Sequence, residues 1–131
     1  MEIVLIHWLI KKGREIDFEN HWQRMKIETN NGLLREILTT PDKNTFDPKF
    51  QTFTLENPNY TTYINIGIWQ SLKDFDRAIQ KYFPKATSEK KGDKTVQTIE
   101  LEDFEFKIRE RIVLRKVLDR GISLPDADLK E

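Results

Sequence analysis

The chain of 131 residues contains no cysteine and has no excess of charge of either sign. Without cysteine it can form no disulfide bond, no thiolate nucleophile and no cysteine-bound zinc or iron–sulfur centre. Its 22 basic side chains balance its 22 acidic ones, so no net field draws it to nucleic acid or to an anionic membrane. We therefore expect neither nucleic acid nor a membrane among its partners.

Histidine, glycine and long apolar runs are also scarce. The only two histidines, His7 and His21, are too few and too far apart in sequence to predict a transition-metal site. The five glycines form neither a phosphate-binding loop nor a dinucleotide fingerprint. The N-terminus lacks the features of a secretion signal, and its apolar run is shorter than the roughly 20 residues that span a bilayer. The sequence predicts a cytoplasmic protein without metal or cofactor.

What is present is a strand–helix–strand pattern that occurs twice. Short apolar runs rich in β-branched residues predict strands at 3–10, 33–38, 60–69 and 104–118, and a shorter one at 96–101. Phe18, Trp22 and Met25 have helical spacing, and Asn30-Asn31-Gly32 is a typical stop for that helix. A second helix is predicted from Leu72 to Tyr82, with Ser71 as its N-cap and Asp74 three residues later.

This pattern fits one domain over residues 1–118, followed by a polar tail at 119–131. Two long loops are expected near 42–59 and 84–103, the second opening with a charged connector from Lys85 to Lys94. Apolar side chains in the first loop suggest an extended arm that packs against something. Loops of this length are uncommon in compact domains unless they cover a site or an interface.

Each predicted helix has one apolar stripe, so the two helices can cover one face of a four-stranded antiparallel sheet. The predicted fold is α+β and ferredoxin-like, with the order β-α-β-β-α-β. The face beneath the helices is expected to hold the wholly apolar strand positions: Val4, Ile6, Trp8, Ile10, Ile64, Ile66, Ile68, Phe106, Ile108, Ile112 and Leu114. The opposite face is expected to be mixed: Leu5, His7, Leu9, Tyr63, Asn65, Trp69, Arg109, Arg111, Val113 and Arg115.

A sheet face that contains leucine, tyrosine and tryptophan is too apolar to stay bare in water. Burial against a second copy around a two-fold axis solves this at low cost, so the sequence predicts a homodimer. The alternative is a monomer in which the long loop and the tail cover the same face.

The chain resembles the antibiotic biosynthesis monooxygenase family, the dimeric α/β-barrel branch of ferredoxin-like folds. The likeness lies in the first strand ending at Lys12-Gly13 before a helix with Phe18 and Trp22. It continues in Gly67-Ile68-Trp69 followed by Ser71 and Phe75, which is similar to that family's Trp-x-Ser-x-x-x-Phe signature. It extends over roughly residues 3 to 118, with longer insertions than expected near 42–59 and 84–103.

The resemblance implies a homodimer in which each subunit has a cavity between its sheet and its helices or loops. Members oxidise aromatic polyketides without metal or flavin, degrade haem, or have no known activity. Haem-degrading members use an asparagine in the first strand, a tryptophan at the position of Trp69 and a histidine in the second helix region. Only Trp69 matches here, and no histidine follows it in the chain. This argues against haem degradation by that route.

Four side chains are candidates for binding or catalysis on an aromatic substrate. Trp69 can stack on a flat ligand and donate a hydrogen bond from its indole, although a purely structural role at the strand–helix joint is the alternative. His7 is the candidate general base that would form the phenolate needed to react with oxygen, with a structural role as its alternative. Tyr63 and Asn65 alternate onto the same predicted face as Trp69 and could orient a polar aromatic molecule.

Arg109 and Arg111 are candidate anion-binding residues, able to hold a carboxylate or stabilise a developing enolate. Their alternative is a solvated or inter-subunit face that pairs with carboxylates. Two functional hypotheses remain open. One is a cofactor-independent monooxygenase-like enzyme acting on a small flat phenolic or quinone-like metabolite. The other is a non-catalytic dimeric module that binds a small ligand or regulates a partner.

Overall fold

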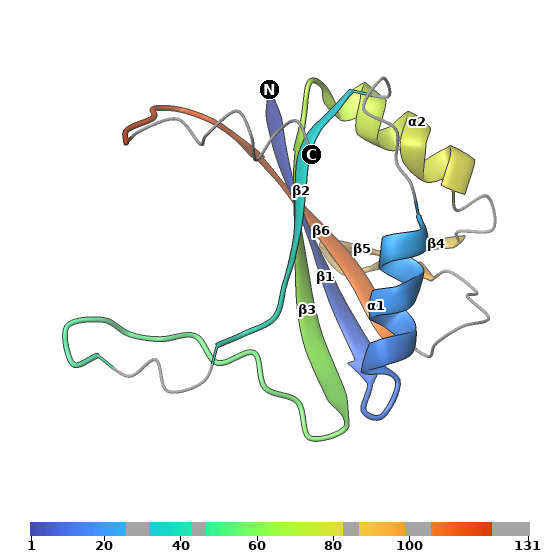
Figure 1. Ribbon diagram of the computed structural model, residues 1–131, viewed down its shortest axis with the longest axis vertical. Coiled ribbons are helices and arrows are strands. Elements are labelled where there is room, and N and C mark those ends of the chain that lie inside the picture. Colours follow the sequence, from blue (N-terminus) through green and yellow to red (C-terminus); the bar gives the residue numbers. More distant parts are fainter. Residues whose placement is uncertain (26–31, 43–46, 83–86, 99–105, 122–131) are drawn as a thin grey trace.

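The computed structural model describes residues 1–25, 32–42, 47–82, 87–98 and 106–121. Its helices and strands follow in the order β1 (Glu2–Lys11), α1 (Glu15–Arg24), β2 (Leu33–Thr39), β3 (Tyr60–Trp69), α2 (Leu72–Tyr82), β4 (Thr87–Lys91), β5 (Lys94–Thr98) and β6 (Phe106–Arg115). Four strands form one sheet in the order β2-β3-β1-β6, in which all neighbours are antiparallel. Both helices lie on the same side of this sheet (Figure 1). This is the predicted ferredoxin-like α+β fold.

The second long insertion differs from its prediction. Residues 87–98, placed largely in a charged connector, form a two-stranded antiparallel hairpin of β4 and β5. Gly92 at its turn has φ +63, a conformation that glycine adopts without a Cβ penalty. The first insertion contains no helix or strand in its described part, 47–59, as expected. The first helix ends at Arg24, earlier than the predicted stop at Asn30-Asn31-Gly32. Asn30, Asn31 and the predicted start of the last strand at 104 lie outside the described residues.

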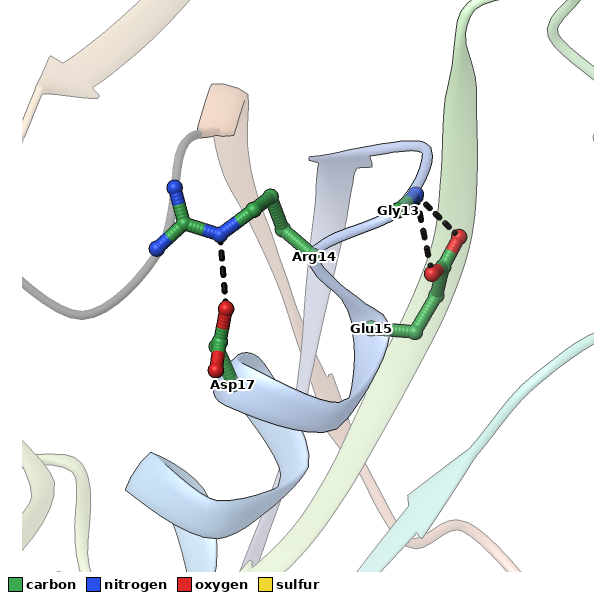
Figure 2. A network of polar contacts seen from close by, with 4 residues as sticks. All are labelled: Gly13, Arg14, Glu15 and Asp17. Carbon is green, nitrogen blue, oxygen red and sulfur yellow. Dashed lines mark hydrogen bonds and ion pairs between the residues drawn. The ribbon is translucent and has the colours of Figure 1, made fainter.

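The entrance to α1 is organised by its own polar side chains rather than by a side-chain N-cap. The Glu15 carboxylate accepts hydrogen bonds from the backbone N–H of Gly13 at 3.0 and 3.1 Å, and from Thr61 Oγ1 on β3 at 2.9 Å. Arg14 Nε lies 2.7 Å from Asp17 Oδ2 (Figure 2). Acidic residues in the first turn also favour the positive end of the helix dipole. The bond from Thr61 ties the start of α1 to the start of β3.

The start of α2 follows its prediction. Ser71 Oγ accepts a hydrogen bond from the backbone N–H of Asp74 at 3.2 Å and donates one to Asp74 Oδ2 at 2.9 Å. The helix therefore begins at Leu72, shortly after Trp69, the last residue of β3. The strand–helix joint expected from the sequence is confirmed.

The assignment of sheet faces was wrong for two of the strands. Positions paired between antiparallel strands share a face, and Trp8 of the buried β1 face is paired with both Tyr63 and Arg109. The side chains beneath the helices on β3 and β6 are therefore Tyr63, Asn65, Trp69, Arg109 and Arg111, whereas Ile64, Ile66, Ile68, Ile112 and Leu114 point away from them. Only β1 has the predicted orientation. The core consists of Val4, Ile6, Trp8, Ile10, Phe18, Tyr63, Trp69, Phe75 and Ala78.

The other face of the sheet is aliphatic. The register places four such side chains in one row that crosses all four strands: Ile37, Ile66, Leu5 and Ile112. The next row contains Ile68, Ile3 and Leu114. Ile112 is 56% exposed and Leu114 is 43% exposed. The connection between β2 and β3 extends from the sheet on the side away from the helices (Figure 1).

Candidate functional site

Two adjoining hollows lie on the helix side of the sheet. The larger is a cleft of about 600 Å³ between α1 and β2, and the smaller is a cavity of about 40 Å³ between the sheet and both helices. Trp22 and Glu36 line both of them. The rest of the cavity is lined by Ile6, Trp8, Met25, Asn65, Trp69, Phe75, Ile79 and Arg109. Two of the predicted site residues on β3, together with Arg109, therefore do meet in one cavity.

A chain of hydrogen bonds runs between the two hollows. Trp22 Nε1 on α1 donates a hydrogen bond of 2.9 Å to Oδ1 of Asn65 on β3. The Asn65 side chain is in turn hydrogen-bonded to the Glu36 carboxylate on β2. Because its oxygen accepts from Trp22, its amide N–H remains as the donor to Glu36. Burial raises the pKa of Glu36, and the bond from Asn65 partly opposes that rise.

Trp69 is almost fully buried, with 1% of its surface exposed, and its ring meets that of Phe75 edge-on at 5.4 Å. A Cβ atom added to Gly67 would lie 2.7 Å from Trp69 Nε1, so only glycine leaves room for the indole at that point. The predicted structural role at the strand–helix joint is thus visible in these contacts. The indole also forms part of the cavity wall, so the two roles do not exclude each other.

The two predicted arginines have different environments. Arg109 is 4% exposed, lines the cavity, and has its guanidinium 5.3 Å from the centre of the Trp8 ring. Burial lowers its pKa to about 10, which still leaves the group charged at neutral pH. Arg111 is exposed, pairs with Asp76 of α2 at 2.9 Å and covers Phe75. It does not line either hollow, in agreement with the ion-pair alternative.

Tyr63 lines the larger cleft. Its hydroxyl donates a hydrogen bond of 2.7 Å to Glu19 Oε2 on α1. Burial and the nearby carboxylate hold the pKa of Tyr63 well above its usual range, so the phenol stays neutral. Tyr63 thus contributes a neutral hydroxyl to the cleft wall and not a phenolate.

His7 lies apart from all of these residues. It is paired with Ile64 on β3 and with Glu110 on β6, so its side chain is on the face away from the helices. Its Nε2 is buried and has no hydrogen-bond partner among the described residues. The expectation that His7 shares a face with Tyr63, Asn65 and Trp69 is wrong. Its predicted role as general base at that site gains no support from its position.

Sequence reasoning did not single out Glu36, and it treated Trp22 only as a core position. A signal was present, since Glu36 and its neighbour Arg35 are the two charged residues within the strand run Leu33-Leu34-Arg35-Glu36-Ile37-Leu38, which is otherwise apolar. A charged residue within such a run is commonly solvated, so the pattern alone could not place it beside Asn65. Within the described residues, no group of three or more acidic or histidine side chains is placed to hold a metal ion.

No family model matches the sequence, and the search of curated proteins found no match. The fold is that of an α+β ferredoxin-like protein. A similar solved structure is that of a MhuD variant with two manganese protoporphyrin IX molecules bound per active site, at a TM-score of 0.53 and 16% identity. The match covers 91% of this chain and 98% of that one. At this identity the likeness shows the fold, and the ferredoxin-like fold implied by the resemblance to antibiotic biosynthesis monooxygenases is confirmed.

No helix in the described part of the chain is long and apolar enough to cross a membrane.

Proposed function

We propose that this protein binds a small flat aromatic molecule, phenolic or quinone-like, in the cleft between α1 and β2. We further propose that it oxidises this molecule as a monooxygenase-like enzyme without a bound cofactor. The observation that carries the proposal is that the cleft shares two lining residues, Trp22 and Glu36, with the cavity that is also lined by Asn65, Trp69 and Arg109. The MhuD variant of similar fold has two manganese protoporphyrin IX molecules bound per active site, which supports a site for a flat ligand in this chain.

The sizes of the two hollows define how such a ligand would lie. Small-molecule sites commonly have volumes of roughly 300–1,000 Å³, a range that includes the 600 Å³ cleft. A cavity of about 150 Å³ is needed to hold one benzene ring, so the 40 Å³ cavity can admit only a substituent. We infer that the ring system occupies the cleft beside Trp22 and that its hydroxyl end reaches toward Glu36 and Asn65.

The chemistry needs molecular oxygen as the oxidant. A phenol and one O₂ give a quinone and one water, so one oxygen atom enters the ring and the other leaves as water. The side chains would bind the ring through Trp22, orient its hydroxyl through the Asn65 amide, and stabilise the phenolate by the charge of Arg109. Phenolate formation is the step that makes the ring electron-rich enough to react.

Binding and turnover can be measured separately. A naphthoquinone and a dihydroxynaphthalene serve as ligands, with protoporphyrin IX beside them because the similar structure contains a manganese derivative. Binding should quench tryptophan fluorescence, and Arg109→Gln should weaken the binding of an ionised phenol. Oxygen consumption with formation of a quinone would establish the enzyme. The proposal fails if none of these ligands binds at millimolar concentration.

A second function is favoured by the position of His7. The one imidazole predicted as general base lies on the far side of the sheet, away from the cavity. A non-catalytic module that binds the same class of ligand needs Trp22, Asn65 and Trp69 but no base. Binding without oxygen consumption would select this function.

We also propose that the protein is a homodimer in which the aliphatic sheet face of one copy packs against that of another. Two-fold association brings the same surface of both copies together. The row of Ile37, Ile66, Leu5 and Ile112 provides such a surface across the full width of the sheet. Phe50 and Phe53, in the connection between β2 and β3, are 73% and 92% exposed in the single chain, and a partner could cover them. From the sequence alone, the cytoplasm remains the proposed location.

A further inference from the structure

We propose that Glu36 is a catalytic residue of this site, accepting the proton of the phenolic hydroxyl of the bound ligand. This rests on the proposed function, because it concerns the same cleft and cavity. Glu36 lies on β2 opposite Gly67 and on the helix side of the sheet. Its side chain lines both hollows, so it stands where a ligand in the cleft would meet the cavity.

The surroundings of Glu36 hold it in one orientation. The Asn65 amide donates to its carboxylate, and Trp22 fixes Asn65 from the other side. Gly67, the residue paired with Glu36, has no side chain, and the Trp69 indole occupies the space above it. A carboxylate fixed on one side by an amide still has a free oxygen lone pair for a hydroxyl proton.

The charged groups around Glu36 have distinct partners or positions. In the cleft, Glu19 accepts the hydrogen bond of Tyr63, and Arg35 points to the aliphatic face of the sheet together with Ile68. In the cavity, Arg109 is the cationic lining residue. Glu36 and Arg109 thus provide a half-buried acceptor of the proton and a buried positive charge for the anion that remains. Their separate strands, β2 and β6, place them on two walls of one cavity.

The proposed step is a single proton transfer. The O–H bond of the phenol breaks, a new O–H bond forms on the Glu36 carboxylate, and the electron pair stays on the phenolate oxygen. Burial raises the pKa of Glu36, and the charge of Arg109 favours the phenolate and so lowers the pKa of the phenol. Both effects reduce the difference between the pKa of the proton donor and that of the acceptor. No oxidant takes part until the phenolate exists.

The test measures turnover of a dihydroxynaphthalene, as oxygen consumption, against pH. In the wild-type protein we expect the rate to fall as the pH drops through the raised pKa of Glu36, because the protonated carboxyl can no longer accept the phenolic proton. Glu36→Gln should still bind the ligand, but should turn it over more slowly by roughly 10²-fold or more and without this fall at low pH. Glu56→Gln, an exposed carboxylate in the connection between β2 and β3, is the matched control and should behave as wild type. An unchanged rate and pH profile in Glu36→Gln would overturn the proposal.

A second measurement needs no ligand. Carboxyl carbon NMR of the free protein, assigned by comparison with Glu36→Gln, follows the titration of Glu36 directly. We expect its midpoint to lie above 4.5, the ordinary value for a glutamate. If Glu36 titrates at that ordinary value, it is not suited to take a phenolic proton, and the proposal is wrong. Failure of the wild-type protein to bind any aromatic ligand would instead contradict the proposed function, so the two failures are distinguishable.

Discussion

Trp22 Nε1 and Asn65 Oδ1 form a hydrogen bond of 2.9 Å that joins α1 to the middle of β3 across 43 residues of sequence. This bond orients the Asn65 amide toward Glu36 and forms the boundary between the cleft and the cavity. It connects the stability of the helix to the geometry of the proposed site. The first prediction concerns this bond.

Trp22→Phe should lower the free energy of unfolding by about 1–3 kcal/mol, since it leaves the buried Asn65 oxygen without its donor. In a double-mutant cycle with Asn65→Ala, the coupling energy between the two residues should be about 1 kcal/mol. Urea denaturation of the four proteins measures both values. A coupling energy near zero would show that the bond does not contribute to stability in solution.

Gly67→Ala should destabilise the protein by roughly 1–3 kcal/mol, the usual cost of overpacking. The new Cβ would lie 2.7 Å from Trp69 Nε1 and would force the indole to move. Adding Trp69→Phe removes that nitrogen and should make the alanine less costly than it is in the wild-type background. Thermal unfolding measures each variant. If the alanine costs the same in both backgrounds, contact with the indole is not the cause.

The wild-type protein should have a mass of about twice 15.7 kDa in light scattering at micromolar concentration. Ile112→Lys should give the monomer, because it places a charge at the β6 end of the aliphatic row. Ile16→Lys is the matched control, since Ile16 on α1 is even more exposed, at 74%, and lies outside that face. A wild-type mass near 15.7 kDa would contradict the homodimer.

Glu36 should make stability depend on pH. Its pKa in the folded protein is raised above the ordinary value of 4.5, so the folded state binds the proton more tightly than the unfolded state. The stabilisation is complete below the ordinary value and is lost as the pH rises through the raised one. As the pH rises through the raised pKa of Glu36, the wild type should lose this stabilisation, whereas Glu36→Gln should not. The free energy of unfolding of Glu36→Gln should therefore increase relative to that of the wild type. Urea denaturation between pH 4 and neutral pH, with Glu56→Gln as control, tests this. A constant difference between the two proteins would contradict it.

Much of the fold could be predicted because the sequence patterns of strands and helix starts depend on residues that are close together in the chain. The alternation in Tyr60–Trp69 indicated a strand irrespective of its neighbours, and Ser71 with Asp74 marked the start of α2 by the hydrogen bonds that those two residues form. Placing Trp69 at the strand–helix joint follows from the same two elements. The strand predicted at 96–101 overlaps β5, whereas β4 was missed because its residues are polar and lack the apolar runs used to find the other strands.

The sequence by itself determined which residues of each strand share a face, since side chains alternate along any strand. Only the tertiary structure decided which face lies beneath the helices. Isoleucines at 64, 66 and 68 looked like the core, yet that face points away from the helices, and the aromatic and polar side chains of β3 point inward. The physical reason is that both faces are apolar enough to be buried, so the alternation alone cannot distinguish them. The strand register that pairs Trp8 with Tyr63 and Arg109 is a long-range feature. This register places His7 on the opposite face from Trp69, and Glu36 lines the cavity together with Trp69.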